Sequence, residues 1–60
     1  MTRLESQIIL SVKLWETVDI PELERRTARR DGGLAVAILG LIQRGRFAIT
    51  PDFRYQRVRA

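Results

Sequence analysis

The longest apolar stretch of the chain, from Gly33 to Gly45, constrains the fold most strongly. Within it Leu34, Ile38 and Leu41 recur at intervals of four and three residues, which is the spacing of one face of an α-helix. Gly45 follows the last turn, and glycine often ends a helix because it adopts left-handed backbone angles at little cost. The stretch therefore predicts a helix that buries one face and stops at Gly45.

A first helix is predicted at the N-terminus. The segment from Thr2 to Glu5 has the form of a capping box, in which each side chain bonds the other residue's backbone. We expect this helix to end near Trp15 or Glu16. The single tryptophan, Trp15, is expected to close the core, because a domain of this size needs its large apolar area. The apolar face of this helix carries Leu4, Ile8 and Val12.

A second helix is predicted over Pro21–Ala28. Asp19 precedes it as an N-cap, and proline is favoured in a first turn because its missing N–H is not needed there. Val18 and Leu23 have the spacing of a hydrophobic staple, and residues 17–20 can form a very short strand. The basic segment from residue 29 to residue 33 is then expected to be a turn in which paired glycines supply unusual backbone angles.

After Gly45 the apolar pattern changes to that of strands. Residues 47–49 and 53–58 are predicted to form a hairpin around the turn Thr50-Pro51-Asp52. Alternation along the second strand places Phe53, Tyr55 and Arg57 on one side. It places Arg54, Gln56 and Val58 on the other.

Length and composition bound the remaining classes. The 60 residues are expected to form one domain, residues 1–60, with no cysteine or histidine for a disulfide or a typical zinc site. No cofactor is expected. No stretch approaches the roughly 18 to 20 apolar residues of a membrane span, and the N-terminus lacks a signal-peptide pattern. The cytoplasm is the expected location.

Charge is divided unevenly along the chain. Residues 1–24 carry two basic against five acidic residues, whereas residues 25–60 carry nine arginines against two aspartates. Arginine suits both phosphate groups and the carboxylates of a protein partner. Ser and Thr residues have no histidine to activate them, and Gly32-Gly33 lacks the spacing and lysine of a phosphate-binding loop. An enzyme is therefore not expected.

The order helix, short strand, helix, turn, helix and two-stranded hairpin resembles the winged helix-turn-helix family, an α+β fold. The resemblance covers about residues 3–58 and includes the spacing of Leu23, Leu34, Ile38, Leu41 and Gly45. It implies DNA binding, with the third helix in the major groove and the hairpin, or wing, against backbone or minor groove. The alternative fold is a three-helix bundle with a loose C-terminal tail.

The sequence departs from that family on the third helix. Its expected outward positions carry no side chain that can donate or accept a hydrogen bond, although base edges are distinguished by such bonds. These positions are Ala35, Val36, Ala37, Leu39 and Gly40.

Two hypotheses about function follow. In the first, DNA is bound mainly through arginine–phosphate contacts of turn and wing, with Arg54 near the wing tip as the best single candidate. The arginines concerned are Arg29, Arg30, Arg44, Arg46, Arg54 and Arg57. In the second, the third helix is a protein interface, either a homodimer seam or a dock for an acidic partner. The residues of that interface are Ala35, Val36, Leu39 and Gly40.

Overall fold

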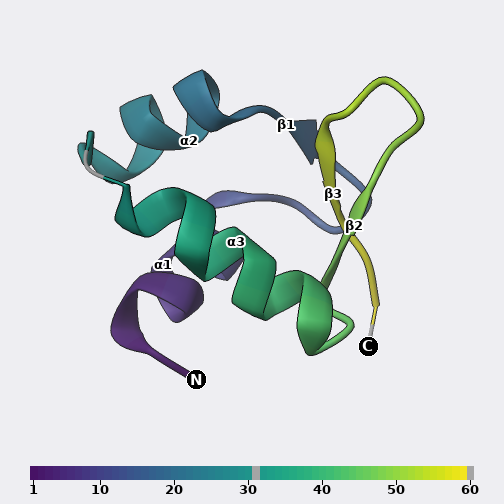
Figure 1. Cartoon of the computed structure of the whole chain (residues 1–60), viewed down its shortest axis with the longest axis horizontal. Helices are drawn as coiled ribbons and strands as arrows, with labels where there is room; N and C mark the ends of the chain where they lie inside the picture. Colours follow the sequence, from purple (N-terminus) through teal and green to yellow (C-terminus); the bar gives the residue numbers. More distant parts are fainter. Residues whose placement is uncertain (31, 60) are drawn as a thin grey trace.

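The computed structural model describes residues 1–30 and 32–59 of the chain, and Asp31, inside the predicted turn, lies outside them. Three helices and three strands make an α+β fold (Figure 1). In chain order they are α1 (Arg3–Ser11), β1 (Thr17–Val18), α2 (Ile20–Thr27), α3 (Gly33–Gln43), β2 (Phe47–Ile49) and β3 (Tyr55–Arg57). All six elements were expected from the sequence, although several boundaries differ.

The sheet is antiparallel and has the strand order β1-β3-β2. On one side of β3, Thr17 pairs with Gln56, and on the other side Phe47 pairs with Arg57. The last strand is therefore the middle one, bonded to two strands that are far apart in the sequence. The C-terminal segment is part of the fold, and the alternative of a loose tail behind a three-helix bundle is wrong.

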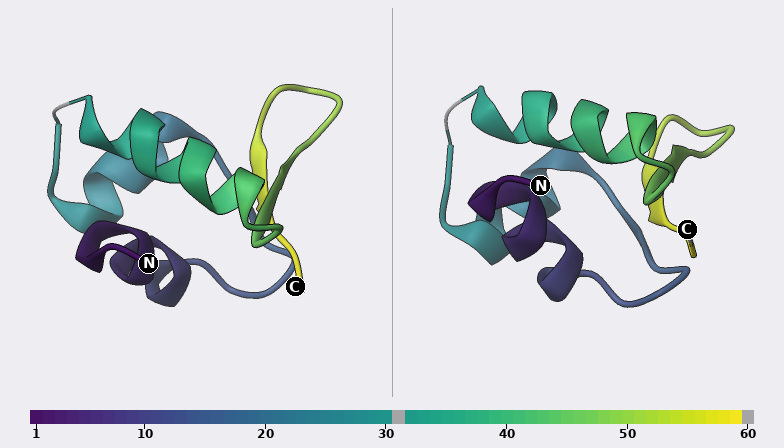
Figure 2. Two further views of the ribbon diagram at one scale, coloured as in Figure 1. Left: turned by 60° about the horizontal axis from the view of Figure 1, so that its bottom comes forward. Right: turned by 90° about the horizontal axis from the view of Figure 1, so that it is seen from below.

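The core lies where the three helices meet the sheet. Figure 2 shows α3 along one side of the molecule, over α1 and α2, with the β2–β3 hairpin beyond its C-terminal end. Leu34, Ile38 and Leu41 all point inward, as their spacing predicts. The complete buried cluster is Ile8, Val12, Val18, Leu23, Leu34, Ala37, Ile38, Leu41 and Phe47.

The helix starts confirm the predicted caps. The Glu5 N–H donates to Thr2 Oγ1 at 3.1 Å, and the Thr2 N–H donates to Glu5 Oε1 at 2.6 Å, which completes the capping box. Asp19 Oδ1 accepts from the Glu22 N–H at 3.0 Å. These bonds satisfy backbone donors that a helix start otherwise leaves without partners.

The predicted helix end at Gly45 is also confirmed. Gly45 has a φ of 76°, in the left-handed region where glycine carries no Cβ penalty. Its N–H donates to the Ile42 carbonyl at 3.0 Å, and the Arg46 N–H donates to the Leu41 carbonyl at 2.8 Å. This pair of bonds is a Schellman motif, which turns the chain directly from α3 into β2.

The predicted end of the first helix near Trp15 or Glu16 is wrong, because α1 ends at Ser11. Val12 has extended backbone angles, so the helix does not continue. The chain then reaches the last strand, where the Trp15 N–H donates to the Arg57 carbonyl at 2.8 Å. Trp15 is 56% exposed, with a φ of 69°, so it does not close the core. Phe47 is the large buried aromatic instead.

The prediction that paired glycines supply unusual backbone angles in the turn between α2 and α3 is wrong at the described positions. Gly32 has an ordinary φ of −68°, and Gly33 is the first residue of α3. The left-handed residue is Ala28, with a φ of 56°, at the end of α2. The Arg29 N–H donates to the Glu24 carbonyl at 3.1 Å, so the turn out of α2 is made before the glycines are reached.

Arg26 joins three parts of the fold. It forms ion pairs with Glu16 Oε2 at 2.7 Å and Glu22 Oε2 at 2.8 Å, and its Nη1 donates to the Ser11 carbonyl at 2.8 Å. The hydrogen bonds from Arg26 lower the pKa of Glu16 from 4.5 to about 2. The network thus ties α2 to the end of α1 and to the residue before β1.

This network predicts a specific loss of stability in acid. Because the pKa of Glu16 is lower in the folded chain, the unfolded chain takes up its proton first, and the contribution is lost as the pH falls from about 4.5 towards 2. We expect Glu16→Gln to flatten the pH dependence of urea denaturation in that range. Glu24→Gln, a change of the same kind on α2 outside the network, should keep the wild-type slope. Equal slopes for Glu16→Gln and the wild type would contradict this role.

Candidate nucleic-acid interface

The exposed side of α3 is apolar up to Gln43, the last residue of the helix, which is exposed and polar. Val36 is 72% exposed and Leu39 55% exposed, and Ala35 is exposed beside them. We call these three residues the α3 face. Ala37, predicted to point outward, is buried at 7% exposure. The prediction was wrong because Ala37 lies one turn from both Leu34 and Leu41 and so belongs to the buried stripe.

Gly40 is covered by a side chain of the same protein. A Cβ on Gly40 would lie 2.5 Å from Glu5 Oε2, so α1 already occupies the close approach that a small residue permits. Glu5 is only 5% exposed, and its pKa is lowered, mainly by the hydrogen bond from the Thr2 backbone. Arg44 Nε lies 3.6 Å from the same Glu5 oxygen. The interface hypothesis required Gly40 to be open to the backbone of another molecule, and it is not.

A shallow apolar groove runs between the start of α1 and α3. Its walls include Leu4 and Gly40, Val36 and Leu39 of α3, and Arg44 at one end. Apolar surface of this kind on a small protein often marks an interface. The groove therefore contains two exposed residues of the predicted protein interface, Val36 and Leu39.

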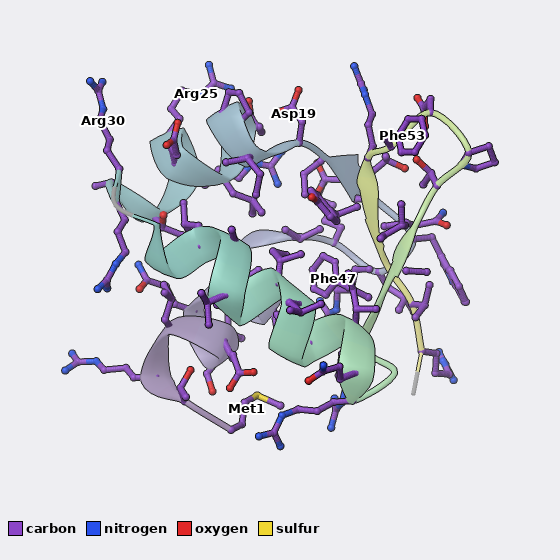
Figure 3. All side chains as sticks on the ribbon, viewed as in Figure 1. Met1, Asp19, Arg25, Arg30, Phe47 and Phe53 are labelled. Atoms are coloured by element: carbon purple, nitrogen blue, oxygen red, sulfur yellow. The ribbon has the colours of Figure 1, made fainter. Side chains whose placement is uncertain are left out.

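Arginines border the α3 face at both ends. Arg29 and Arg30 are exposed in the turn before α3, and Figure 3 shows Arg30 extending away from the ribbon. Arg44 follows the helix, and its side chain is 51% exposed. An 11-residue helix is about 16 Å long at 1.5 Å per residue. The two groups of positive charge are thus separated by roughly the length of α3.

The tip of the β2–β3 hairpin, the predicted wing, carries another exposed arginine. The side chain of Arg54 is 54% exposed and lies 3.8 Å from Asp52. Thr50 holds the turn closed, because its N–H donates to the Arg54 carbonyl at 2.8 Å and its hydroxyl is bonded to Asp52. Phe53 stands beside Arg54, 85% exposed and with a φ of 63° (Figure 3).

Phe53 was not singled out from the sequence as a surface residue. Its position directly after Thr50-Pro51-Asp52 was the available signal, because the residue that completes such a turn points outward.

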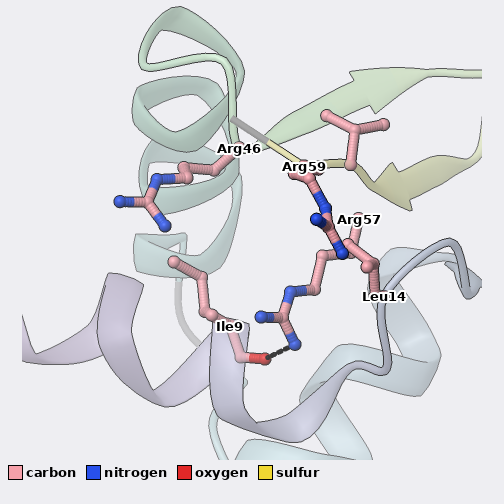
Figure 4. A pocket seen from close by; sticks show the side chains of 6 residues that line it. Ile9, Leu14, Arg46, Arg57 and Arg59 are labelled. Carbon is pink, nitrogen blue, oxygen red and sulfur yellow. Dashed lines mark hydrogen bonds between the residues drawn. The ribbon is translucent and has the colours of Figure 1, made fainter.

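Arg57 is a structural residue and not part of that surface. Its Nη1 donates to the Ile9 carbonyl at 3.1 Å and to the Val12 carbonyl at 2.8 Å, at the end of α1 (Figure 4). Strand alternation correctly put Arg57 on the side of Tyr55, which packs against the core. Arg57 therefore has a structural role that the sequence did not predict, and its predicted contact with DNA stays a prediction. Arg46 is also separate from Arg44, since it lies beside Ile9 near Arg57.

The position of Arg57 predicts its effect on stability. Arg57→Met keeps most of the aliphatic stem but removes the guanidinium donor from the Ile9 and Val12 carbonyls, of which Ile9 keeps a longer bond from the Val12 N–H. We expect a loss of about 1–3 kcal/mol in the free energy of unfolding. Urea denaturation at neutral pH measures the change. Arg59→Met is the matched control, because Arg59 is exposed and surface substitutions usually stay within about 0.5 kcal/mol. Equal stability of the two variants would show that Arg57 does not hold α1.

Residues 1–30 and 32–59 bear on two other classes of site. No group of three acidic, histidine or cysteine side chains there is placed to hold a metal ion. No helix in these ranges is long and apolar enough to span a membrane.

Comparison of the chain with protein-family models, with curated proteins and with solved structures gave no match. The geometry of the chain is therefore the evidence that bears on its function.

Proposed function

We propose that this protein is a small, non-enzymatic DNA-binding regulator of the winged-helix type, which holds duplex DNA mainly through arginine–phosphate contacts. The observation that carries this proposal is the placement of arginines at both ends of α3 and at the wing tip. The contacting residues in this proposal are Arg29, Arg30, Arg44 and Arg54. Arg46 and Arg57 are left out because they lie together at a separate hollow.

The spacing of these charges fits a duplex. The major groove is about 12 Å wide, and α3 separates its bordering arginines by about 16 Å. Arginines at its two ends can therefore reach phosphates on opposite sides of the groove. Ala35 and Val36 are short enough to let the helix lie close to the bases, where they can contact thymine methyl groups. Without donors or acceptors there, sequence preference comes mainly from DNA shape.

The distribution of charge supports the same proposal. The acidic side chains of the first half of the chain are largely engaged inside the fold. Glu5 pairs with Arg44, Glu16 with Arg26, and Asp19 caps α2. The exposed arginines of the second half therefore dominate the field around α3 and the wing, and such a field steers a polyanion to the surface.

The proposal predicts a defined salt dependence. Four phosphate contacts give a slope of log K against log salt concentration of about −3.6, from about −0.9 for each contact. Fluorescence anisotropy of a labelled random duplex at several salt concentrations measures it. Arg30→Gln should weaken binding and reduce the magnitude of the slope by about 0.9, whereas Lys13→Gln, the same charge change on the α1–β1 loop, should not. No binding at low salt would overturn the proposal.

The apolar groove favours a second candidate function, association with another copy of the chain. Val36 and Leu39 are more than half exposed, and a chain of 60 residues gains stability from any partner that binds only its folded state. In this alternative the α3 face is the seam of a homodimer and no DNA is bound.

The alternative is tested by the oligomeric state. Leu39→Glu should leave the fold intact, because Leu39 is already 55% exposed, but should dissociate a dimer measured by sedimentation. Ile49→Glu is the matched control, since Ile49 is 57% exposed on β2, away from the groove. A wild-type chain that stays monomeric at high concentration contradicts the dimer.

A further inference from the structure

A second basic site lies apart from the α3 face. It is a hollow of about 260 Å³ between the end of α1 and the last strand (Figure 4). Three of its lining residues are arginines, three are apolar, and none is acidic. They are Ile9, Leu14, Arg46, Arg57, Val58 and Arg59. We call this feature the arginine hollow. None of the four arginines of the proposed DNA contact lines it, whereas Arg46 and Arg57, which the sequence also predicted to contact DNA, do.

Backbone pairing brings these arginines together. The Val58 N–H donates to the Arg46 carbonyl at 3.0 Å, which extends the pairing of β2 with β3 by one step. Arg57 and Arg59 flank Val58 in the sequence, so all three arginines are fixed around the same bond. The Arg57 N–H also donates to the Glu16 carbonyl at 3.0 Å. The sheet therefore sets where the backbone of each of the three arginines lies.

Arg57 is oriented before any ligand arrives. Both of its bonds to the Ile9 and Val12 carbonyls come from Nη1, and the side chain is half-buried. A guanidinium has donors on Nε and Nη2 as well, and their geometry is rigid. Fixing Nη1 therefore also fixes the direction of the other donors, which reduces the entropy lost when they bind an anion.

No carboxylate of the described residues compensates the charges in the hollow. Within residues 1–30 and 32–59, no carboxylate lies at ion-pair distance from Arg46, Arg57 or Arg59. Four arginines elsewhere on the fold differ, since Arg25, Arg26, Arg44 and Arg54 each pair with a carboxylate. Apolar walls from Ile9 and Leu14 reduce the solvent around the hollow and strengthen its interaction with an anion.

We propose that the arginine hollow binds a phosphoryl group. Phosphate carries up to two negative charges and several acceptor oxygens, and arginine forks match phosphate oxygens in pairs. Arg57 is the fixed contact. Arg46 and Arg59 are exposed and have long stems, and they approach from the two sides of Ile9 (Figure 4), so they can close over the anion. The phosphoryl group is either that of a small soluble ligand or a backbone phosphate of the DNA, and the second case rests on the function proposed above.

Inorganic phosphate is the first probe. We would titrate the full chain at constant ionic strength and follow the arginine Nε–Hε resonances by NMR. Saturable shifts confined to Arg46, Arg57 and Arg59 are expected. Arg46→Gln with Arg59→Gln should weaken phosphate binding roughly tenfold or more, as expected for two charge-assisted bonds. The control, Arg3→Gln with Arg25→Gln, removes the same charge from exposed sites outside both the hollow and the proposed DNA contact, and should bind phosphate as the wild type does.

The outcomes separate the site from general electrostatics. Shifts that do not saturate, or that are similar at every arginine, would overturn the site, as would equal weakening in the control. The amide spectrum shows whether each variant is folded. If the double variant does not fold, Arg59→Gln alone replaces it, because Arg59 lies at the exposed end of the chain.

A competition experiment distinguishes the two sources. Phosphate at saturating concentration is added to the complex with labelled duplex, and sodium chloride of equal ionic strength serves as the control. Displacement beyond that of chloride assigns the hollow to a DNA backbone phosphate. Phosphate binding without displacement assigns it to a small ligand. A chain that binds phosphate but no duplex supports the hollow while the proposed DNA function fails.

Discussion

The pairing of β3 with both β1 and β2 is the constraint on which the other parts of the structure depend. Thr17 lies between α1 and α2 and Phe47 follows α3, yet both pair with the last strand. The side chain of Arg57 adds a third link, because it bonds the final carbonyls of α1. A chain too short for a large core is therefore closed by its C-terminal strand. That closure also fixes the backbone of Arg46 and Arg57, since the Arg46 carbonyl accepts from the Val58 N–H and the Arg57 N–H donates to the Glu16 carbonyl.

The arginines have two distinct kinds of role. Arg26 and Arg57 hold elements together, Arg26 through carboxylates and Arg57 through backbone carbonyls. Arg30, Arg44 and Arg54 stand around the exposed side of α3 and at the wing tip. The net charge of +4 thus understates the positive field on that side of the molecule. The net charge alone does not tell which arginines hold elements together and which are exposed around α3.

Local signals predicted the elements well, and tertiary contacts explain what they missed. The cap residues Thr2 and Asp19 and the glycine at position 45 act within one turn of the backbone, so the sequence identifies them directly. The end of α1 depends on a bond from Trp15 to Arg57, and the role of Arg57 depends on a helix far from it in the sequence. Sequence spacing contains neither contact. The winged-helix assignment and DNA binding stay predictions.

Amide hydrogen exchange tests the central claim most directly, because it measures each backbone bond of β3 separately. The Arg57 and Val58 N–H groups, which donate to the Glu16 and Arg46 carbonyls, should be protected nearly as strongly as that of Leu41 in the buried stripe of α3. That result would establish the last strand as part of the cooperative fold. Exchange of Arg57 and Val58 at the rate of an unstructured chain, with Leu41 still protected, would contradict it and leave a helical bundle with a detached tail.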